Sequence, residues 1–315
     1  MSQHSVSEFK SVPWCFNGHA HTILPSLLFS SPAMEYKRIR ITTPDDDFID
    51  LDVAEQENED SPVVVIFHGL EGSSERYYVR KLGKHLFDAG MHIVAVNFRS
   101  CSGEINKQPR FYHSGETEDP GTIFRWVDNY FSPTKKFATG FSLGASMLLN
   151  YLRQQQSNHL ITAFSAVSTP FNLKCGSINL QKGFNRIYDY RFLRTLVLKL
   201  DEKREMFPGL PMFSGSTLYD FDDQVTGPIH GFDDADDYYR TCSSAFFMNE
   251  IQTPGLIIHS KQDPLCPFEF TPIDDIENNS NLTSAFLERG GHVGFWSQPS
   301  GWMEHATAQY FEQFL

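Results

Sequence analysis

Strand and helix signals alternate along most of this 315-residue sequence. Val63-Val64-Val65-Ile66-Phe67 is an unbroken apolar run, typical of a strand buried on both faces of a parallel sheet. Further strands are predicted at residues 92–97, 135–139, 161–167, 255–259 and 282–287, and helices at 76–89, 118–130, 143–155 and 302–313. This alternation predicts an α/β fold, with a mostly parallel central sheet flanked by helices.

A hairpin is predicted ahead of this series. Residues 36–41 and 48–53 alternate between polar and apolar side chains, which predicts two antiparallel strands. Asp45-Asp46-Asp47 lies between them, and we interpret it as a solvated turn rather than a cation site.

One long segment, residues 170–250, interrupts the alternation. It contains a predicted helix at 190–200 and is too long for a simple crossover between two strands. We therefore expect an inserted helical cap over the carboxyl ends of the strands. The core would then comprise residues 1–169 and 251–315, with residues 1–35 as an N-terminal extension packed on it.

Composition narrows the possible partners. No cluster of Lys and Arg appears, which argues against nucleic acid, and the formal net charge of −13 argues against docking on anionic lipid. No signal peptide is visible, and no apolar run approaches the ~20 residues that span a bilayer. The five cysteines form no CxxC pair, which favours reduced thiols. We expect a cytoplasmic protein with no stable membrane anchor, and its oligomeric state stays open.

The strongest chemical signal is Gly140-Phe141-Ser142-Leu143-Gly144. It follows a predicted strand and opens a predicted helix, the context in which a G-x-S-x-G string forms a nucleophile elbow. The serine there needs a sharp strand-to-helix turn, and the flanking glycines let neighbouring backbone pass without a Cβ clash. We predict that Ser142 is a nucleophile.

A second string, His68-Gly69-Leu70-Glu71-Gly72, follows the buried strand 63–67. In a fold of this kind that loop supplies one backbone N–H of an oxyanion hole, and the residue after the nucleophile supplies the other. Leu70 and Leu143 are therefore the candidate donors. We expect His68 to be a structural hydrogen-bonding residue rather than a general base.

The acid and the base of such a site follow the serine in that order. Asp263 comes soon after strand 255–259, and His292 lies between glycines after strand 282–287, so both stand at the ends of successive strands. They are the candidate triad partners of Ser142. Rival groups are the cap carboxylates and one helical histidine: Asp222, Asp223, Asp233, Asp234 and His305.

Metal and nucleotide chemistry find little support. His19-Ala20-His21 is an H-x-H pair, but no cysteine or acid stands near it at metal-ligand spacing, so we interpret it as packing or surface. No phosphate-binding glycine string follows a strand. We therefore predict no cofactor and no metal.

Several strings together resemble the YheT-like branch of the α/β-hydrolases, whose eukaryotic relatives are the ABHD esterases and lipases. The matching strings are residues 17–25, 68–73, 97–104, 112–119, 140–144 and 291–292, which cover nearly the whole chain. The resemblance implies the α/β-hydrolase fold, a triad of Ser142, Asp263 and His292, and carboxylesterase activity. The sequence differs at His21, where Gln is usual, and at Ser100, where Gly is usual, and both differences put substrate fit in question.

The resulting hypothesis is a serine carboxylesterase that cleaves small-molecule esters of short to medium chain length through an acyl-enzyme on Ser142. A thioesterase, an amidase, a lipase or an acyltransferase would use the same residues. The fold can also serve as a non-catalytic binding module, although that function normally goes with a damaged triad. A serine at the elbow excludes the dehalogenases and epoxide hydrolases, which carry aspartate there.

Overall fold

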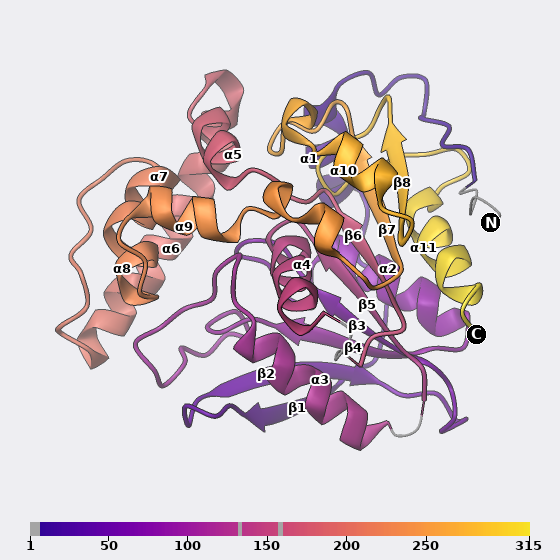
Figure 1. Cartoon of the computed structure of the whole chain (residues 1–315), viewed down its shortest axis with the longest axis horizontal. Helices are drawn as coiled ribbons and strands as arrows, with labels where there is room; N and C mark the ends of the chain where they lie inside the picture. Colours follow the sequence, from indigo (N-terminus) through magenta and orange to yellow (C-terminus); the bar gives the residue numbers. More distant parts are fainter. Residues whose placement is uncertain (1–6, 132–133, 157–159) are drawn as a thin grey trace.

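Eight strands form one central sheet in the computed structural model, which describes residues 7–131, 134–156 and 160–315 (Figure 1). They are β1 (Lys37–Thr42), β2 (Phe48–Ala54), β3 (Val63–Phe67), β4 (His92–Asn97), β5 (Lys136–Phe141), β6 (Ala163–Val167), β7 (Gly255–Ser260) and β8 (Leu282–Leu287). Their order across the sheet is β1-β2-β4-β3-β5-β6-β7-β8. The β1–β2 and β2–β4 pairs are antiparallel and all other pairs are parallel, which confirms the predicted fold class.

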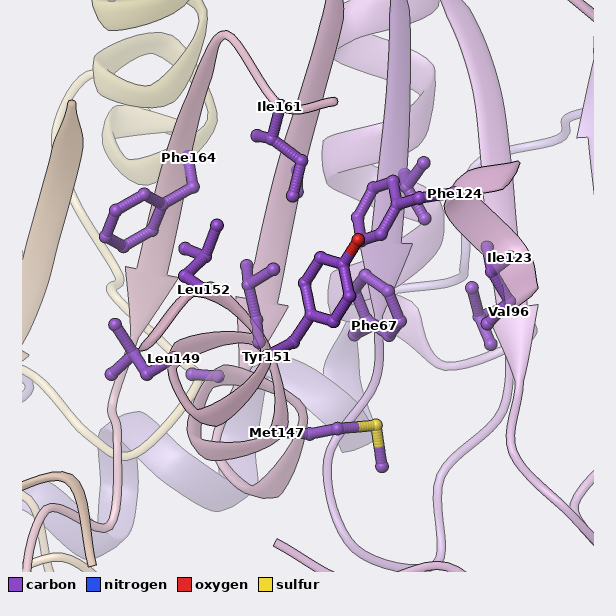
Figure 2. Close-up of a cluster of buried hydrophobic side chains, with 14 of the residues drawn as sticks. Phe67, Val96, Ile123, Phe124, Met147, Leu149, Tyr151, Leu152, Ile161 and Phe164 are labelled. Atoms are coloured by element: carbon purple, nitrogen blue, oxygen red, sulfur yellow. The ribbon is translucent and has the colours of Figure 1, made fainter. Parts of the chain in front are cut away.

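Two pairs of helices cover the two faces of this sheet. Helices α3 (Glu118–Tyr130) and α4 (Leu143–Gln155) bury their apolar residues in one core cluster, while α2 (Tyr77–Asp88) and α11 (Trp302–Glu312) bury theirs in another. Strand β3 serves both: Val63, Val65 and Phe67 point into the first cluster, and Val64 and Ile66 into the second. A strand with two buried faces needs an unbroken apolar sequence, which explains the run at 63–67. Figure 2 shows part of the first cluster.

The element positions follow the sequence prediction closely. The β1–β2 hairpin is confirmed, and α3 and β8 occupy the predicted residues. The strand expected to end at residue 139 continues to Phe141, so it brings the chain right up to Ser142. Two helices of the core were not predicted: α1 (Gly18–Leu28) and α10 (Ile273–Asn278).

A helical insertion separates β6 from β7. It contains α5 (Leu173–Leu180), α6 (Arg186–Met206), α7 (Leu218–Phe221), α8 (Gly227–Ile229) and α9 (Ala235–Cys242), which stand together to one side of the sheet in Figure 1. Helix α6 is longer than predicted. Its Leu193, Leu196 and Leu200 recur every three or four residues and pack with the apolar side chains of α7. The boundaries 170–250 for a separate cap stay a prediction.

The acidic turn between β1 and β2 holds a buried arginine. Arg99 is only 1% exposed, and its guanidinium binds Asp45 and Asp47 at 2.9 Å each. On its other side Arg99 makes a bidentate pair with Asp119, the second residue of α3, at 2.7 and 2.8 Å. The interpretation of 45–47 as a solvated turn is therefore wrong for Asp47, which is buried. The turn, the loop after β4 and the start of α3 are joined through one side chain.

Arg99→Ala is expected to lower the free energy of unfolding by about 3–5 kcal/mol, because it leaves buried carboxylates without their cation. The measurement is denaturant unfolding followed by circular dichroism. Arg240→Ala is the matched control: Arg240 pairs with Asp237 on the surface, so its loss should cost at most about 0.5 kcal/mol. Equal effects of the two substitutions would contradict the structural role given to Arg99.

Candidate active site

Ser142 stands at the turn between β5 and α4, at the carboxyl edge of the parallel strands. Its backbone angles are φ 52° and ψ −120°, a conformation that a residue with a side chain adopts only at a cost. The turn is fixed from both sides: the Ser142 N–H donates to the carbonyl of Val167 at 2.9 Å, and its own carbonyl accepts the N–H groups of Ala145 and Ser146. The hydroxyl is thereby held at the edge of the sheet.

The two glycines of the elbow allow α4 to approach the sheet. A Cβ at Gly144 would lie 2.4 Å from the carbonyl oxygen of His68 and 2.7 Å from that of Phe67. A Cβ at Gly140 would lie 2.5 Å from the Cα of Ala145. Contacts this short are backbone contacts that cannot move aside, so glycine is required at both positions.

Three predicted residues come together in one hydrogen-bonded chain. His292 Nε2 lies 2.7 Å from Ser142 Oγ, and His292 Nδ1 lies 2.9 and 3.1 Å from the two carboxylate oxygens of Asp263. A carboxylate only accepts, so Nδ1 carries the proton and Nε2 is free to accept from the serine hydroxyl. The three residues come from the loops after β5, β7 and β8, which are not adjacent in the sequence.

Asp263 is held in place by more than the histidine. Its Oδ1 also accepts the backbone N–H groups of Leu265 at 2.9 Å and Cys266 at 3.0 Å. Burial alone would raise the pKa of Asp263, but His292, His259 and the Cys266 N–H stabilise the anion and bring the pKa below its ordinary value. The carboxylate is therefore charged at neutral pH and fixed in orientation.

Helix α1 packs against the loops that carry the acid and the histidine. The hydroxyl of Thr22 accepts the backbone N–H of His292 at 2.9 Å. The approach is close on both sides: a Cβ at Gly18 would lie 1.7 Å from the carbonyl oxygen of Gln262, and one at Gly291 would lie 2.5 Å from Thr22 N. The N-terminal segment thus positions both loops, a role that the sequence analysis missed.

The His19-Ala20-His21 string takes part in the packing of α1 against its neighbours. His21 is fully buried; its Nδ1 accepts the N–H of Trp296 at 3.2 Å, and its Nε2 lies 3.2 Å from the carbonyl oxygen of Cys15. Burial lowers the pKa of His21, in keeping with a neutral ring that both donates and accepts. His19 lies 3.0 Å from the hydroxyl of Tyr188 on α6. Both histidines are structural, as interpreted.

The loop of residues 68–72, which carries the predicted oxyanion donor Leu70, leaves one backbone N–H without a hydrogen-bond acceptor among the described residues. The N–H of Gly69 donates to the Tyr78 hydroxyl, that of Glu71 to the Tyr112 hydroxyl, and that of Gly72 to the Gly69 carbonyl. The N–H of Leu70 has no partner among the described residues. The loop also touches the serine, since a Cβ at Gly69 would lie 3.2 Å from Ser142 Cβ.

The second candidate donor is the first residue of α4. An N–H at that position has no acceptor inside the helix, and that of Leu143 has none elsewhere in the described chain. It also stands at the positive end of the helix dipole. Leu70 and Leu143 both line a cavity together with Ser142 and His292.

Glu71 connects this loop to the insertion. It has a left-handed φ of 53°, and its carboxylate oxygen Oε1 accepts from Lys199 Nζ on α6 and from the Tyr112 hydroxyl, each at 2.8 Å. These bonds fix the residue next to the Leu70 amide. No local pattern could predict this contact, because Lys199 and Glu71 are 128 residues apart in the sequence.

His68 is buried in the same loop and structural, as predicted. Its Nδ1 lies 2.7 Å from the Gly69 carbonyl oxygen, and its Nε2 accepts the N–H of Phe98 at 3.2 Å. Burial lowers the pKa of His68 to about 3, so the ring is neutral.

Two cavities meet at Ser142 and His292. The deeper one runs beneath the insertion, and most of its wall is apolar; among its lining residues are Leu173, Gly176, Leu180, Phe192, Leu196, Leu218 and Phe221. The wider one lies between α1 and α6, and its lining includes Ile23, Leu27, Arg76, Tyr77, Tyr188 and Arg191. Neither His21 nor Ser100 lines either cavity. Ser100 has a φ of 61°, which accounts for the glycine usual there.

The rival groups have other partners. Asp222, which lines the deeper cavity, accepts from the Tyr239 hydroxyl, Asp223 accepts the Ala235 N–H, and Asp234 caps α9. His305 lies on α11, with its ring near that of His85. None of these four contacts His292 within the described chain.

One group of described residues could offer three atoms to a metal ion: Asp263, Cys266 and His292. Burial raises the pKa of the Cys266 thiol well above its ordinary value, and Asp263 adds to the effect. A metal needs the thiolate, so this group suits a hydrogen-bonded acid–histidine pair better than a zinc ion. All five cysteines are free thiols, in keeping with the expectation of reduced cysteines.

The fold is shared with solved esterases. The Pyrococcus furiosus esterase Pf2001 aligns over 98% of both chains with a TM-score of 0.63 and 18% identity. Est1E from Butyrivibrio proteoclasticus covers 88% of this chain and 98% of its own, with a TM-score of 0.60 and 14% identity. The family model described as the alpha/beta hydrolase fold matches residues 62–299. The chain therefore belongs to the α/β-hydrolase family.

Relatives at higher identity narrow the family. The putative esterase YheT of Escherichia coli is 35% identical, over 99% of this chain and 95% of its own. Human phospholipase ABHD3 is 27% identical over 96% of this chain and 78% of its own. A monoacylglycerol lipase of Saccharomyces cerevisiae is 29% identical over 88% of this chain and 64% of its own. These similarities confirm the YheT-like branch, and the chain is a carboxylic ester hydrolase.

Within the described residues, no helix combines the length and the apolar character that crossing a bilayer requires.

Lys199→Met should lower kcat on a short-chain ester by about tenfold while KM changes less than about twofold, because it loosens Glu71 beside the Leu70 amide. Steady-state kinetics test this, and Lys199→Arg should recover part of kcat. Lys174→Met is the control, since Lys174 pairs with Asp236 away from the site. If Lys199→Met keeps the wild-type kcat, Glu71 does not position the donor.

Proposed function

We propose that the protein is a serine carboxylesterase in which Ser142 is the nucleophile, His292 the general base and Asp263 the acid that orients it. The observation that carries this proposal is the hydrogen-bonded chain of the three residues at the junction of two cavities. We further propose residues 170–250 as the cap of this site. A cytoplasmic location stays a prediction from the sequence.

The reaction has two acyl-transfer steps. Ser142 Oγ attacks the ester carbonyl carbon as its proton passes to His292 Nε2. The tetrahedral intermediate collapses, the bond to the alcohol oxygen breaks, and His292 returns the proton to the leaving alcohol. Water then repeats the attack on the acyl-enzyme and releases the acid. Asp263 stabilises the imidazolium and keeps Nδ1 protonated throughout.

The Leu70 and Leu143 amides are the proposed oxyanion hole. Both lie beside Ser142 and neither has another partner in the described chain, so both are available to an oxyanion. Removing one such donor elsewhere costs about 3 kcal/mol of transition-state stabilisation. Their side chains have no part in this role.

The deeper cavity is the proposed acyl site. Its apolar wall suits a hydrocarbon chain, while the wider cavity between α1 and α6 would take the alcohol. Relatives named as phospholipase and monoacylglycerol lipase favour an ester with an acyl chain. We propose short to medium chains, because Asp222, Thr226 and Tyr239 add polar groups to a lining that is otherwise mostly apolar.

Other uses of the same residues stay as alternatives. A thioesterase would differ only in the leaving group, and a screen of matched esters and thioesters separates the two. An acyltransferase would pass the acyl group to an added alcohol, which product analysis would reveal. A non-catalytic module would turn over none of these substrates.

Asp263→Asn should reduce kcat for a short-chain ester by at least about 10²-fold, because the amide cannot stabilise the imidazolium and favours the wrong tautomer. Asp233→Asn is the control from the cap and should stay within about tenfold of the wild type. Circular dichroism confirms that both variants fold. If Asp233→Asn loses its activity while Asp263→Asn keeps a near-normal kcat, then Asp263 is not the triad acid.

Gly176→Leu should shift the acyl-chain optimum to shorter chains. A Cβ at Gly176 meets only the Leu265 carbonyl oxygen, at 3.9 Å, so the new side chain enters the deeper cavity without a backbone clash. KM for long-chain esters should rise, while kcat/KM for an acetyl ester should stay within about threefold of the wild type. Profiling with p-nitrophenyl esters of graded length measures this.

Gly209→Leu is the matched control, because nothing lies within 4 Å of a Cβ there and Gly209 lines neither cavity. An unchanged profile in Gly176→Leu would remove the deeper cavity as the acyl site.

A further inference from the structure

The outer face of helix α6 is unusually apolar for a surface. Ile187 is 55% exposed and Tyr190 is 65% exposed, and Phe184, just before the helix, is half-exposed beside them. Ile187 and Tyr190 are three residues apart, which places their side chains next to each other on the helix surface. Large side chains gathered in this way mark an interaction surface more often than scattered ones do.

Exposed cations accompany these apolar side chains. Lys182, Arg186, Arg191 and Arg194 are all exposed, and none forms an ion pair with another described residue. The one acid in this half of the helix, Asp189, is buried and accepts the N–H of Leu218. The second half of α6 has the opposite character and exposes Asp201, Glu202 and Glu205. Positive charge is therefore concentrated where the apolar side chains are.

This face borders the mouth of the wider cavity. Arg191 lines one wall of that cavity and Leu27, at the end of α1, lines another. Leu27 is 72% exposed, and Leu28 and Phe29 beside it are also exposed. Exposed apolar side chains therefore occur at the end of α1, which lines this cavity, and on α6 near Arg191, which also lines it.

We propose that this surface, formed by Phe184, Arg186, Ile187, Tyr190, Arg194 and the end of α1, docks on a lipid surface that carries anionic head groups. A helix that exposes aromatic and aliphatic side chains flanked by arginines is suited to the interface of a bilayer. The local cations attract the anionic head groups of the lipid. We name this surface the docking face.

The net charge of −13 does not oppose this proposal at close range. At physiological salt, charges farther than about 8 Å apart are largely screened, so the docking face experiences mainly the lipid beneath it. The expectation that this acidic protein avoids anionic lipid considered only the total charge. Docking would place the mouth of the cavity against the lipid, where an ester could enter without crossing water.

The test is co-sedimentation with vesicles of phosphatidylcholine alone and of phosphatidylcholine with phosphatidylglycerol at 7:3, in 0.1 M salt. The wild type should bind the mixed vesicles at least about tenfold more tightly, and 0.5 M salt should weaken that binding. Ile187→Asp with Tyr190→Asp, and separately Arg186→Glu with Arg194→Glu, should each weaken it at least about tenfold.

Phe246→Asp is the matched control, because Phe246 is 61% exposed but lies in the turn Ser244–Phe246 after α9, which packs against α4. It should bind as the wild type does. Ser142→Ala should also bind normally, which separates docking from the proposed catalysis. The docking-face variants should hydrolyse a soluble acetyl ester within about twofold of the wild type, since none of their positions lines a cavity.

Several results would overturn the proposal. They are a wild type that stays in the supernatant, equal binding to the two kinds of vesicle, docking-face variants that bind normally, or a Phe246→Asp variant that loses binding equally. Light scattering adds one more outcome: a dimer that Ile187→Asp with Tyr190→Asp dissociates would show that a second copy of the chain covers this face.

Discussion

The close approach of helix α4 to the end of strand β3 is the constraint on which the site depends. At Gly144 the helix touches the carbonyl groups of Phe67 and His68 so closely that no side chain fits. The turn from β5 into α4 is therefore sharp, and Ser142 must adopt a strained backbone conformation. The same contact brings the start of α4 next to the loop of Leu70. One packing contact thus sets the position of the serine and of both amides proposed as oxyanion donors.

The remaining parts of the site are fixed by segments far apart in the sequence. Helix α1 holds the histidine loop through Thr22 and packs on the acid loop at Gly18, and Lys199 of the insertion holds Glu71 beside Leu70. Preorganisation of this kind matters because a catalytic group displaced by about 1 Å can lose two orders of magnitude in rate. The core strands supply the scaffold, and these contacts align the catalytic groups on it.

Local patterns in the sequence predicted most of the fold. The unbroken run Val63–Phe67 and the glycines around Ser142 each have a short-range physical reason, so the sheet, the elbow and the three residues now found in contact could be predicted. Helix α1 could not be predicted, because it has no acidic residue in its first turn and contains Pro25. Its stabilising contacts are tertiary. The burial of Asp47 and the Lys199–Glu71 pair depend on partners 52 and 128 residues away. Periodicity carries no information about such pairs.

The central claim, that Ser142 forms the acyl-enzyme, is tested most directly by covalent trapping. The protein is treated with a fluorophosphonate, and the modified peptide is identified by mass spectrometry in the wild type and in Ser142→Ala. The account predicts one adduct per chain on Ser142, none in Ser142→Ala, and loss of ester hydrolysis in proportion to labelling. An adduct on another residue, or labelling that persists in Ser142→Ala, would contradict it.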